Sequence, residues 1–356
     1  QQTYSLSRTI ASENLRALPV IAQTGPSWPE AVESLEWSGM DPPLGRAISL
    51  LRGEVGTKSH FNSKLRALNM TETEMKIRIG HSPDPDDAFM FHALTQGLID
   101  TAGRSYEHVL VDIDSLNQEA RNGNFEVSAV SIHSYPKISQ DYALMNCGAS
   151  MGEGYGPILI SNRKMSIEDA KTRVIAVPGK STSSYLSLVL ALGDVQVKEV
   201  PFDRIQPGVL SGEFEVGVII HEGQLTWSKE GAYSVLDLGI WWNQGTGLPL
   251  PLGGNVVRRD LGVDMCRDIS NDIRRSIEYS LSNPDLALQD AIKLGRGIDE
   301  DTNEKFVRMY VNERTIDYGD EGREAVRQFL ERGQEVGLVR PDFDARGMEF
   351  IGADEQ

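Results

Sequence analysis

His221 is the side chain best placed in the sequence to do chemistry, because it directly follows the apolar run 216–220 in the stretch Val216–Gln224 (VGVIIHEGQ). The five residues before it are apolar or glycine, a pattern typical of a strand buried on both faces of a parallel sheet. Ligands of open α/β sheets bind beyond the carboxyl ends of the strands, so this strand would carry the imidazole to a substrate. There it would serve as a general base, since histidine titrates near neutral pH. The alternative is that His221 only caps a loop, and the run by itself leaves both interpretations open.

A second group of polar side chains is the hydroxyl run Ser181-Thr182-Ser183-Ser184. It follows the predicted strand 174–177 and precedes the predicted helix 185–192. The N–H groups of a helix N-terminus lack partners within the helix, so hydroxyls at this point favour an anionic or hydroxyl-bearing ligand. Ordinary N-capping needs one hydroxyl only. Four in succession therefore favour ligand contact over capping alone.

Two further stretches are candidates of lower rank. The acids and prolines of 82–87 (SPDPDD) are ordinary chemistry for a helix start, and they matter for function only if this loop faces a cleft. The predicted strand 127–131 ends in small polar residues that would let a ligand approach the backbone. His133 follows that strand as a second candidate base, although a surface or capping role is favoured for it.

The sequence contains no pattern for a metal or a nucleotide cofactor, and none is expected. The six histidines are scattered, without a His-x-x-x-His pair or paired cysteines. The glycine-rich stretch 152–157 precedes a strand where nucleotide binding requires a helix. The acidic stretch from Asp299 lacks the glycine and the final acid of a calcium loop. No Gly-x-Ser-x-Gly motif supports a serine hydrolase.

Strand and helix signals alternate from residue 75 onward, which predicts parallel sheets joined by right-handed crossovers. The predicted strands are 76–80, 108–112, 127–131, 174–177, 195–200 and 216–220, and the chain is predicted to be helical from residue 264. Two such units with a helical return describe an α/β, two-lobed type II solute-binding-protein fold. The first lobe would comprise 75–162 and 255–352, and the second 163–254, which carries His221. A small ligand would bind in the cleft between them.

Residues 1–74 show no sustained hydrophobic period and contain repeated Pro, Gly, Ser and Thr punctuation. We expect a mostly irregular, poorly ordered extension upstream of a true start at Met75. A small docking segment is the alternative.

Charge and cysteine content restrict the class of protein. The 356 residues carry a net charge of −17, which argues against nucleic acid or an anionic membrane as a partner. Two widely separated cysteines, Cys147 and Cys266, do not form a disulfide framework and indicate a reducing compartment. No apolar run approaches the ~20 residues that span a bilayer. We therefore expect a cytoplasmic protein that acts on a small molecule.

Four stretches together resemble the 1,4-dihydroxy-6-naphthoate synthase family of the futalosine route to menaquinone. They are 217–227 (GVIIHEGQLTW), 237–254 (DLGIWWNQGTGLPLPLGG), the loop 82–86 (SPDPD), and Pro178-Gly179 with the hydroxyls after it. The resemblance covers about 75–352. It implies a lyase that splits cyclic dehypoxanthine futalosine into 1,4-dihydroxy-6-naphthoate and dihydroxyacetone, without a metal or organic cofactor.

The resemblance also implies residue roles. The catalytic base falls on His221, and the substrate contacts fall on Ala129, Val130 and Ser131 and on Thr182 and Ser183. One departure concerns the first loop, where the family usually has cysteine and asparagine at the positions of Asp84 and Asp86. Two carboxylates would repel a substrate carboxylate unless they point away from it, so the contacts of this loop are open.

Three alternatives remain. A solute-binding protein of the same fold would use His221 only as a ligand contact, and it would carry an export signal or a lipid-anchor cysteine, neither of which is seen. A chorismate dehydratase of the same fold lacks an equivalent of the IIHEG run and fits less well. A non-catalytic sensor would need a partner domain, for which only residues 1–74 are available.

Overall fold

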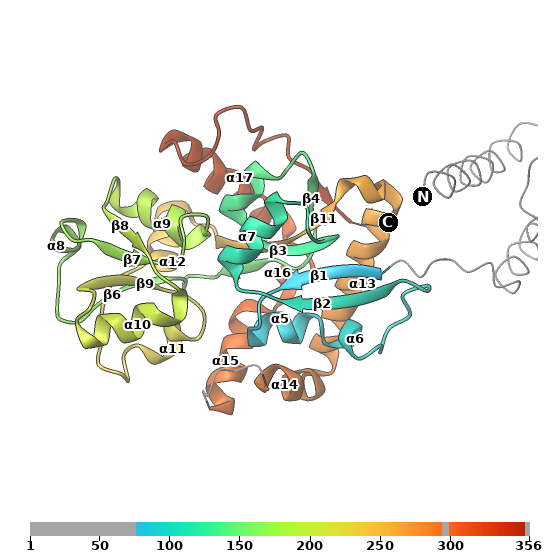
Figure 1. Cartoon of the computed structure of the whole chain (residues 1–356), viewed down its shortest axis with the longest axis horizontal. Helices are drawn as coiled ribbons and strands as arrows, with labels where there is room; N and C mark the ends of the chain where they lie inside the picture. Colours follow the sequence, from blue (N-terminus) through green and yellow to red (C-terminus); the bar gives the residue numbers. More distant parts are fainter. Residues whose placement is uncertain (1–75, 294–298, 353–356) are drawn as a thin grey trace, which may run out of the picture. The chain divides into compact units, whose positions relative to one another are not determined.

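The computed structural model describes residues 76–293 and 299–352, which fold into two β-sheets covered by helices (Figure 1). The predictions for the extension 1–74 and for a start at Met75 lie outside these residues. The two sheets stand side by side along the long direction of the described part, and each carries helices on its faces. None of the described helices is long and apolar enough to cross a membrane.

The first sheet has the strand order β12-β4-β11-β3-β1-β2, with β5 paired to β11. One side of the sheet is the parallel trio of β3, β1 and β2, with β2 at the edge, and β11 runs antiparallel to β3, β4 and β5. Ile77 and Ile79 of β1 are fully buried, as the alternation of that strand predicts. The strands are β1 (Lys76–His81), β2 (Ser105–Leu110), β3 (Val127–Ser131), β4 (Tyr142–Met145), β5 (Ser150–Gly152), β11 (Leu250–Arg258) and β12 (Phe350–Ile351).

The second sheet has the order β10-β6-β9-β7-β8. Its parallel trio is β8, β7 and β9, while β6 runs antiparallel to both β9 and β10. All four residues of β9 are buried, in agreement with a strand covered on both faces. The strands are β6 (Ile158–Ser161), β7 (Ile175–Val177), β8 (Val197–Glu199), β9 (Val216–Ile219) and β10 (Tyr233–Asp237).

The helices of the first half connect strands, and those after β11 cover the first sheet. They are α5 (Pro85–Met90), α6 (His92–Thr95), α7 (Ile113–Arg121), α8 (Ile167–Lys171), α9 (Ser183–Leu192), α10 (Phe202–Ser211), α11 (Gly223–Thr226), α12 (Leu238–Thr246), α13 (Val263–Ser282), α14 (Pro284–Ile292), α15 (Glu300–Tyr310), α16 (Glu313–Ile316) and α17 (Gly319–Glu335), with 3-10 turns at Ile132–Lys137 and Arg259–Leu261. The predicted helix after β1 is divided into α5 and α6 at Phe91.

The tryptophan-rich stretch after β10 builds a rigid corner. Asp237 caps α12 by accepting the N–H groups of Gly239 and Ile240 at 2.9 and 3.0 Å. The buried indole of Trp242 donates to the carbonyl of Pro249 at 3.0 Å and packs edge-on against Phe329 of α17. This corner therefore fixes the chain as it returns to the first sheet through β11.

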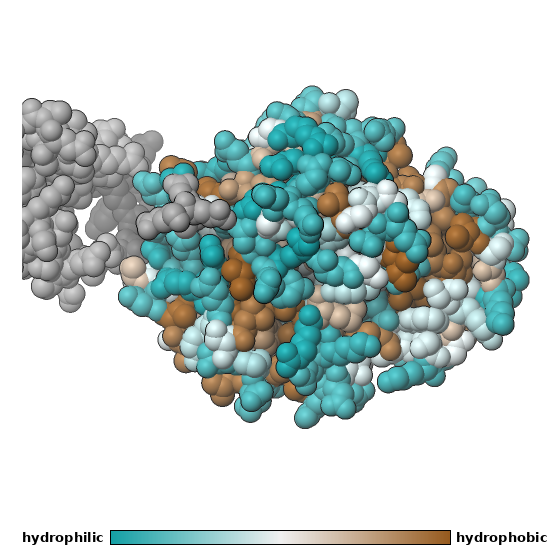
Figure 2. Space-filling model, turned by 180° about the vertical axis from the view of Figure 1, so that it is seen from behind, coloured by the Kyte–Doolittle hydropathy of each residue, from teal (hydrophilic) through white to brown (hydrophobic). Residues whose placement is uncertain are grey.

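The two-lobed fold predicted from the strand pattern is confirmed, but the sheets are mixed rather than wholly parallel. β6 belongs to the second sheet and β11 to the first. We therefore propose that the chain crosses between the lobes before Ile158 and again before Leu250, instead of after residues 162 and 254 as the pattern indicated. Seen from behind, polar side chains cover most of the surface, as the charged composition predicts (Figure 2).

Candidate active site

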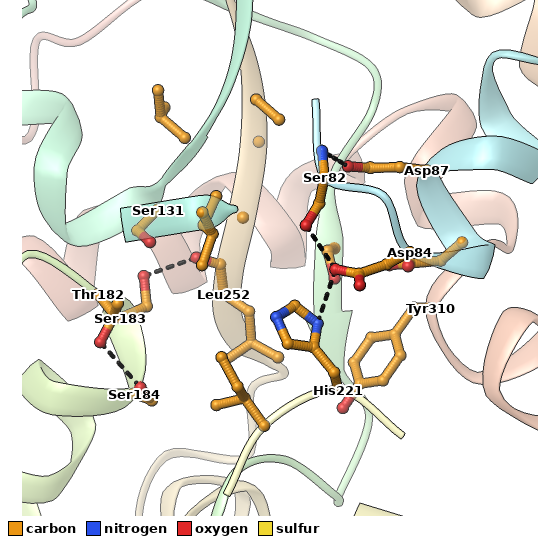
Figure 3. A pocket seen from close by; sticks show the side chains of 18 of the residues that line it. Ser82, Asp84, Asp87, Ser131, Thr182, Ser183, Ser184, His221, Leu252 and Tyr310 are labelled. Carbon is orange, nitrogen blue, oxygen red and sulfur yellow. Dashed lines mark hydrogen bonds and ion pairs between the residues drawn. The ribbon is translucent and has the colours of Figure 1, made fainter. Parts of the chain in front are cut away.

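A cavity opens where the carboxyl ends of the parallel strands of both sheets meet (Figure 3). It encloses about 760 Å³ when the space open to solvent is included. Residues after β1 and residues of β3 line it from the first sheet. The loops after β7 and β9 line it from the second. This is the cleft position that the strand pattern predicts for a ligand.

His221 lies in the wall of this cavity, one residue beyond Ile220 and the end of β9. Its backbone has φ 55°, a left-handed conformation that is uncommon for residues other than glycine and is often found at functional sites. Gln224 holds this backbone in place. With its amide nitrogen directed at Tyr310 Oη and the Gly156 carbonyl, its amide oxygen accepts the His221 N–H at 3.2 Å.

The imidazole of His221 is held between an aromatic ring and a carboxylate. The ring of Phe202 packs edge-on against it, with 4.8 Å between centroids. Its Nδ1 atom lies 3.0 Å from Oδ2 of Asp84, and Ser82 Oγ donates to the same oxygen at 2.5 Å (Figure 3). The opposite ring nitrogen, Nε2, is buried and has no hydrogen-bond partner among the described residues. One nitrogen of the ring is thus occupied and the other is available.

Three carboxyl groups of the first loop lie at the cavity, and burial changes the chemistry of two of them. The pKa of Asp87 is raised to about 7, first by burial and then by the neighbouring Asp84. Burial and the charge of Asp87 raise the pKa of Asp86 well above its ordinary value, and Asp86 Oδ1 has no partner among the described residues. A carboxyl that keeps its proton donates a hydrogen bond and does not repel an anion. The loop therefore faces the cleft without presenting three negative charges to it.

The expected contacts on β3 also line the cavity. Ala129, Val130 and Ser131 are buried within the first sheet and form part of the cavity wall. Asn117 of α7 holds this strand end, because its Oδ1 accepts the Ser131 N–H at 2.8 Å and its Nδ2 donates to Ser131 Oγ at 3.0 Å. The same Nδ2 lies 3.2 Å from Ser181 Oγ in the second lobe. One buried amide therefore links the two lobes beside the cavity.

Thr182 and Ser183 line the cavity as expected, but their hydroxyls already have protein partners. Thr182 is the N-cap of α9, accepting from Tyr185 N at 3.2 Å and donating to the Gly179 carbonyl at 2.7 Å. Ser183 Oγ donates to the Leu252 carbonyl at 2.6 Å and accepts from the N–H of His133 at 3.2 Å. The N–H groups of Thr182 and Tyr185 have acceptors as well, in the Gly179 carbonyl and Thr182 Oγ1, so the donors left by the helix geometry are the N–H groups of Ser183 and Ser184.

His133, the second candidate base, does not lie on the surface and does not line the cavity. It is 2% exposed, with Nδ1 3.1 Å from the Thr182 carbonyl and Nε2 3.3 Å from the Leu338 carbonyl. Burial lowers its pKa to about 4, so the ring is neutral at pH 7. His133 is therefore a buried residue that packs between the end of β3 and the start of α9.

Several cavity residues were not identified from the sequence. Asn255 of β11 is fully buried, and its Nδ2 has no partner among the described residues. The Tyr310 hydroxyl approaches from α15, far along the chain. In the described part of the chain the lining contains no lysine or arginine, so hydroxyl, amide and N–H groups are the donors for a ligand. No local pattern marks Asn255 or Tyr310, because only tertiary packing brings them to the cleft.

Known proteins resemble this chain over the same region. A family model described as menaquinone biosynthesis matches residues 77–335. A protein named 1,4-dihydroxy-6-naphthoate synthase from Thermus thermophilus is 36% identical, and the alignment covers 74% of this chain and 96% of that protein. A crystal structure of a protein from Archaeoglobus fulgidus is 42% identical with a TM-score of 0.71, covering 74% and 98% of the two chains. The alkanesulfonate-binding protein of Xanthomonas axonopodis pv. citri, 11% identical with a TM-score of 0.60 over 78% of this chain and 98% of that one, shares the fold.

Proposed function

Because the chain belongs to the 1,4-dihydroxy-6-naphthoate synthase family and is an enzyme of menaquinone biosynthesis, we propose that it splits cyclic dehypoxanthine futalosine into 1,4-dihydroxy-6-naphthoate and dihydroxyacetone. The enzyme would be a carbon–carbon lyase, and His221 would be its general base. The observation that carries this proposal is the imidazole of His221, which lines the cavity with Nδ1 occupied and Nε2 without a partner.

The reaction divides the atoms of one substrate between two products, so it needs neither water nor an oxidant. Removal of a proton by Nε2 would start the cleavage of the carbon–carbon bond, and formation of the aromatic ring would supply the driving force. A general base contributes about 10²–10⁴-fold to such a step when it lies within hydrogen-bond reach of the proton. The acceptor would be the lone pair of Nε2, which has no partner among the described residues.

The opposite wall of the cavity supplies the groups for holding the substrate in this proposal. Ala129, Val130 and Ser131 would contact it along the strand end. Thr182 and Ser183 at the start of α9 would also contact it, and the donor there would be the Ser183 N–H, since both hydroxyls and the Thr182 N–H are committed to the protein. The partnerless Asn255 amide is a further donor at this wall. The N-terminus of a helix carries partial positive charge and favours an anion. These donors therefore suit an anionic substrate, although they include no lysine or arginine.

The experiment is a direct assay of the purified protein with cyclic dehypoxanthine futalosine. We expect 1,4-dihydroxy-6-naphthoate and dihydroxyacetone to appear in equal amounts, measured by liquid chromatography with mass spectrometry against heat-inactivated protein. Saturable binding of the substrate without either product would contradict the lyase proposal and favour the solute-binding alternative. Cleavage to any other pair of products would contradict the proposed substrate chemistry.

A further inference from the structure

We infer that Asp84 is a positioning residue that fixes the tautomer and orientation of His221, so that Nε2 is the nitrogen that takes the proton. This inference rests on the proposed function for its kinetic consequence, but its structural part concerns the ring alone. The inference comes from the contacts of the loop after β1, which the sequence pattern left without a function.

The contact between the two side chains is buried and direct. His221 Nδ1 lies 3.0 Å from Asp84 Oδ2, with the Asp84 side chain 1% and the His221 side chain 16% exposed. The Ser82 hydroxyl donates to the same carboxylate oxygen at 2.5 Å. A buried, charge-assisted contact of this length orients the ring far more strongly than an exposed pair, which solvent would screen.

Asp84 stands at a helix cap, but its carboxylate contacts His221 and Ser82 and does not cap the helix. Asp84 is the N-cap residue of α5, where aspartate ordinarily accepts an N–H group of the first turn. Here it makes no side-chain cap hydrogen bond, although its backbone has the extended conformation of a cap, with φ −109° and ψ 155°. By contrast Asp112, the N-cap of α7, accepts the Ser115 N–H at 3.1 Å.

The chemistry follows from what a carboxylate can do. An ionised carboxylate only accepts hydrogen bonds, so Nδ1 must carry the proton of a neutral ring, and the lone pair then lies on Nε2. Figure 3 shows Nε2 on the side of the ring away from Asp84. After Nε2 takes a proton, the positive imidazolium faces a negative carboxylate, which stabilises the charge formed in the reaction.

The test reads the tautomer directly, by ¹⁵N–¹H correlation spectra of protein labelled at its histidines. The His221 signals are identified by their absence from His221→Gln. We expect the proton of the neutral ring on Nδ1 in the natural protein and a loss of that preference in Asp84→Ala. Asp84→Glu, which restores a carboxylate, should recover part of it. A natural protein with its proton on Nε2, or an Asp84→Ala spectrum unchanged at His221, would overturn the inference.

A kinetic arm and a matched control separate positioning from folding. Asp84→Ala should lower kcat by about 10²-fold or more while KM changes only a few-fold. Asp112→Ala removes an N-cap carboxylate from another helix, and it should lower the thermal midpoint without altering the His221 tautomer.

If Asp84→Ala does not fold, Asp84→Asn has the same shape without the charge, and a natural kcat in that variant would overturn the inference. Failure of the natural protein to act on the substrate would remove the proposed function, while the spectra would still decide the role of Asp84.

Discussion

The Asp84 carboxylate and the His221 imidazole meet across the cleft, one from the loop after the first strand of the first sheet and the other from the end of β9 in the second. This contact therefore exists only when the two lobes stand in the arrangement seen here. In the sequence, the negative charge of Asp84 suggested that it would repel a substrate carboxylate. In the structure the same carboxylate contacts His221.

Replacing Asp87 with asparagine should stabilise the protein in a pH-dependent way. Burial and Asp84 raise the Asp87 pKa from 3.8 to about 7, so the folded state holds a proton that the unfolded state releases between these values. The stability contributed by protonated Asp87 is full below about pH 4 and is lost as the pH rises through 7. Asp87→Asn should therefore gain at least about 1 kcal/mol at pH 8 and almost nothing at pH 4.

The measurement is urea unfolding of both proteins at pH 4, 6 and 8, compared as differences so that titration of groups distant from Asp87 cancels. The asparagine side chain keeps an oxygen for the Ser82 N–H, which Asp87 Oδ2 accepts at 2.7 Å. An equal difference at all three pH values would show that the ionisation of Asp87 does not govern the effect.

Removing the Asn117 amide should weaken the link between the lobes. Asn117→Ala leaves the buried Ser131 N–H and the Ser181 hydroxyl without this partner, which costs about 1–3 kcal/mol. The midpoint of chemical denaturation should fall accordingly. Asn122→Ala, an exposed change at the C-cap of the same helix, should shift the midpoint by about 0.5 kcal/mol or less. Equal midpoints for the two variants would contradict a structural role for the Asn117 amide.

Gly239 and Gly245 of α12 test how tightly the chain packs after β10, because space for a side chain is absent at the first and present at the second. A Cβ atom at Gly239 would lie 1.9 Å from the Tyr155 carbonyl oxygen, so Gly239→Ala must displace backbone and should destabilise by about 1–3 kcal/mol or more. A Cβ at Gly245 meets nothing within 4 Å, and Gly245→Ala should stabilise the helix by up to about 1 kcal/mol. Thermal unfolding of both variants tests this, and a Gly239→Ala protein as stable as Gly245→Ala would refute the close packing.

The sequence predicts those parts of the fold that local patterns encode. The apolar run before His221 is typical of a buried strand, and the strand is found at 216–219 with its histidine at the cavity. Thr182 is preceded by a turn and followed by a helix, and it caps that helix. Such features depend on periodicity and capping within about ten residues, so they can be recognised without knowledge of the tertiary structure.

The remaining features depend on which distant residues become neighbours. The strand 158–161 is recognisable as a strand, but nothing in its own residues shows that it pairs with β9 in the second sheet. The contact of Asp84 with His221, and the raised pKa of Asp86, arise from burial that only the folded chain creates. Local acidic composition therefore suggested repulsion, whereas tertiary packing pairs Asp84 with His221 and raises the pKa of Asp86.

The central claim is tested most directly by turnover and binding of cyclic dehypoxanthine futalosine with His221→Gln. We expect kcat to fall by at least about 10²-fold, while the Kd from calorimetric titration stays within a few-fold of the natural protein. His92→Gln, which alters a histidine paired to Asp290 away from the cavity, serves as the control and should keep its kcat. A His221→Gln protein that forms both products at the natural rate would contradict the assignment of His221 as the base.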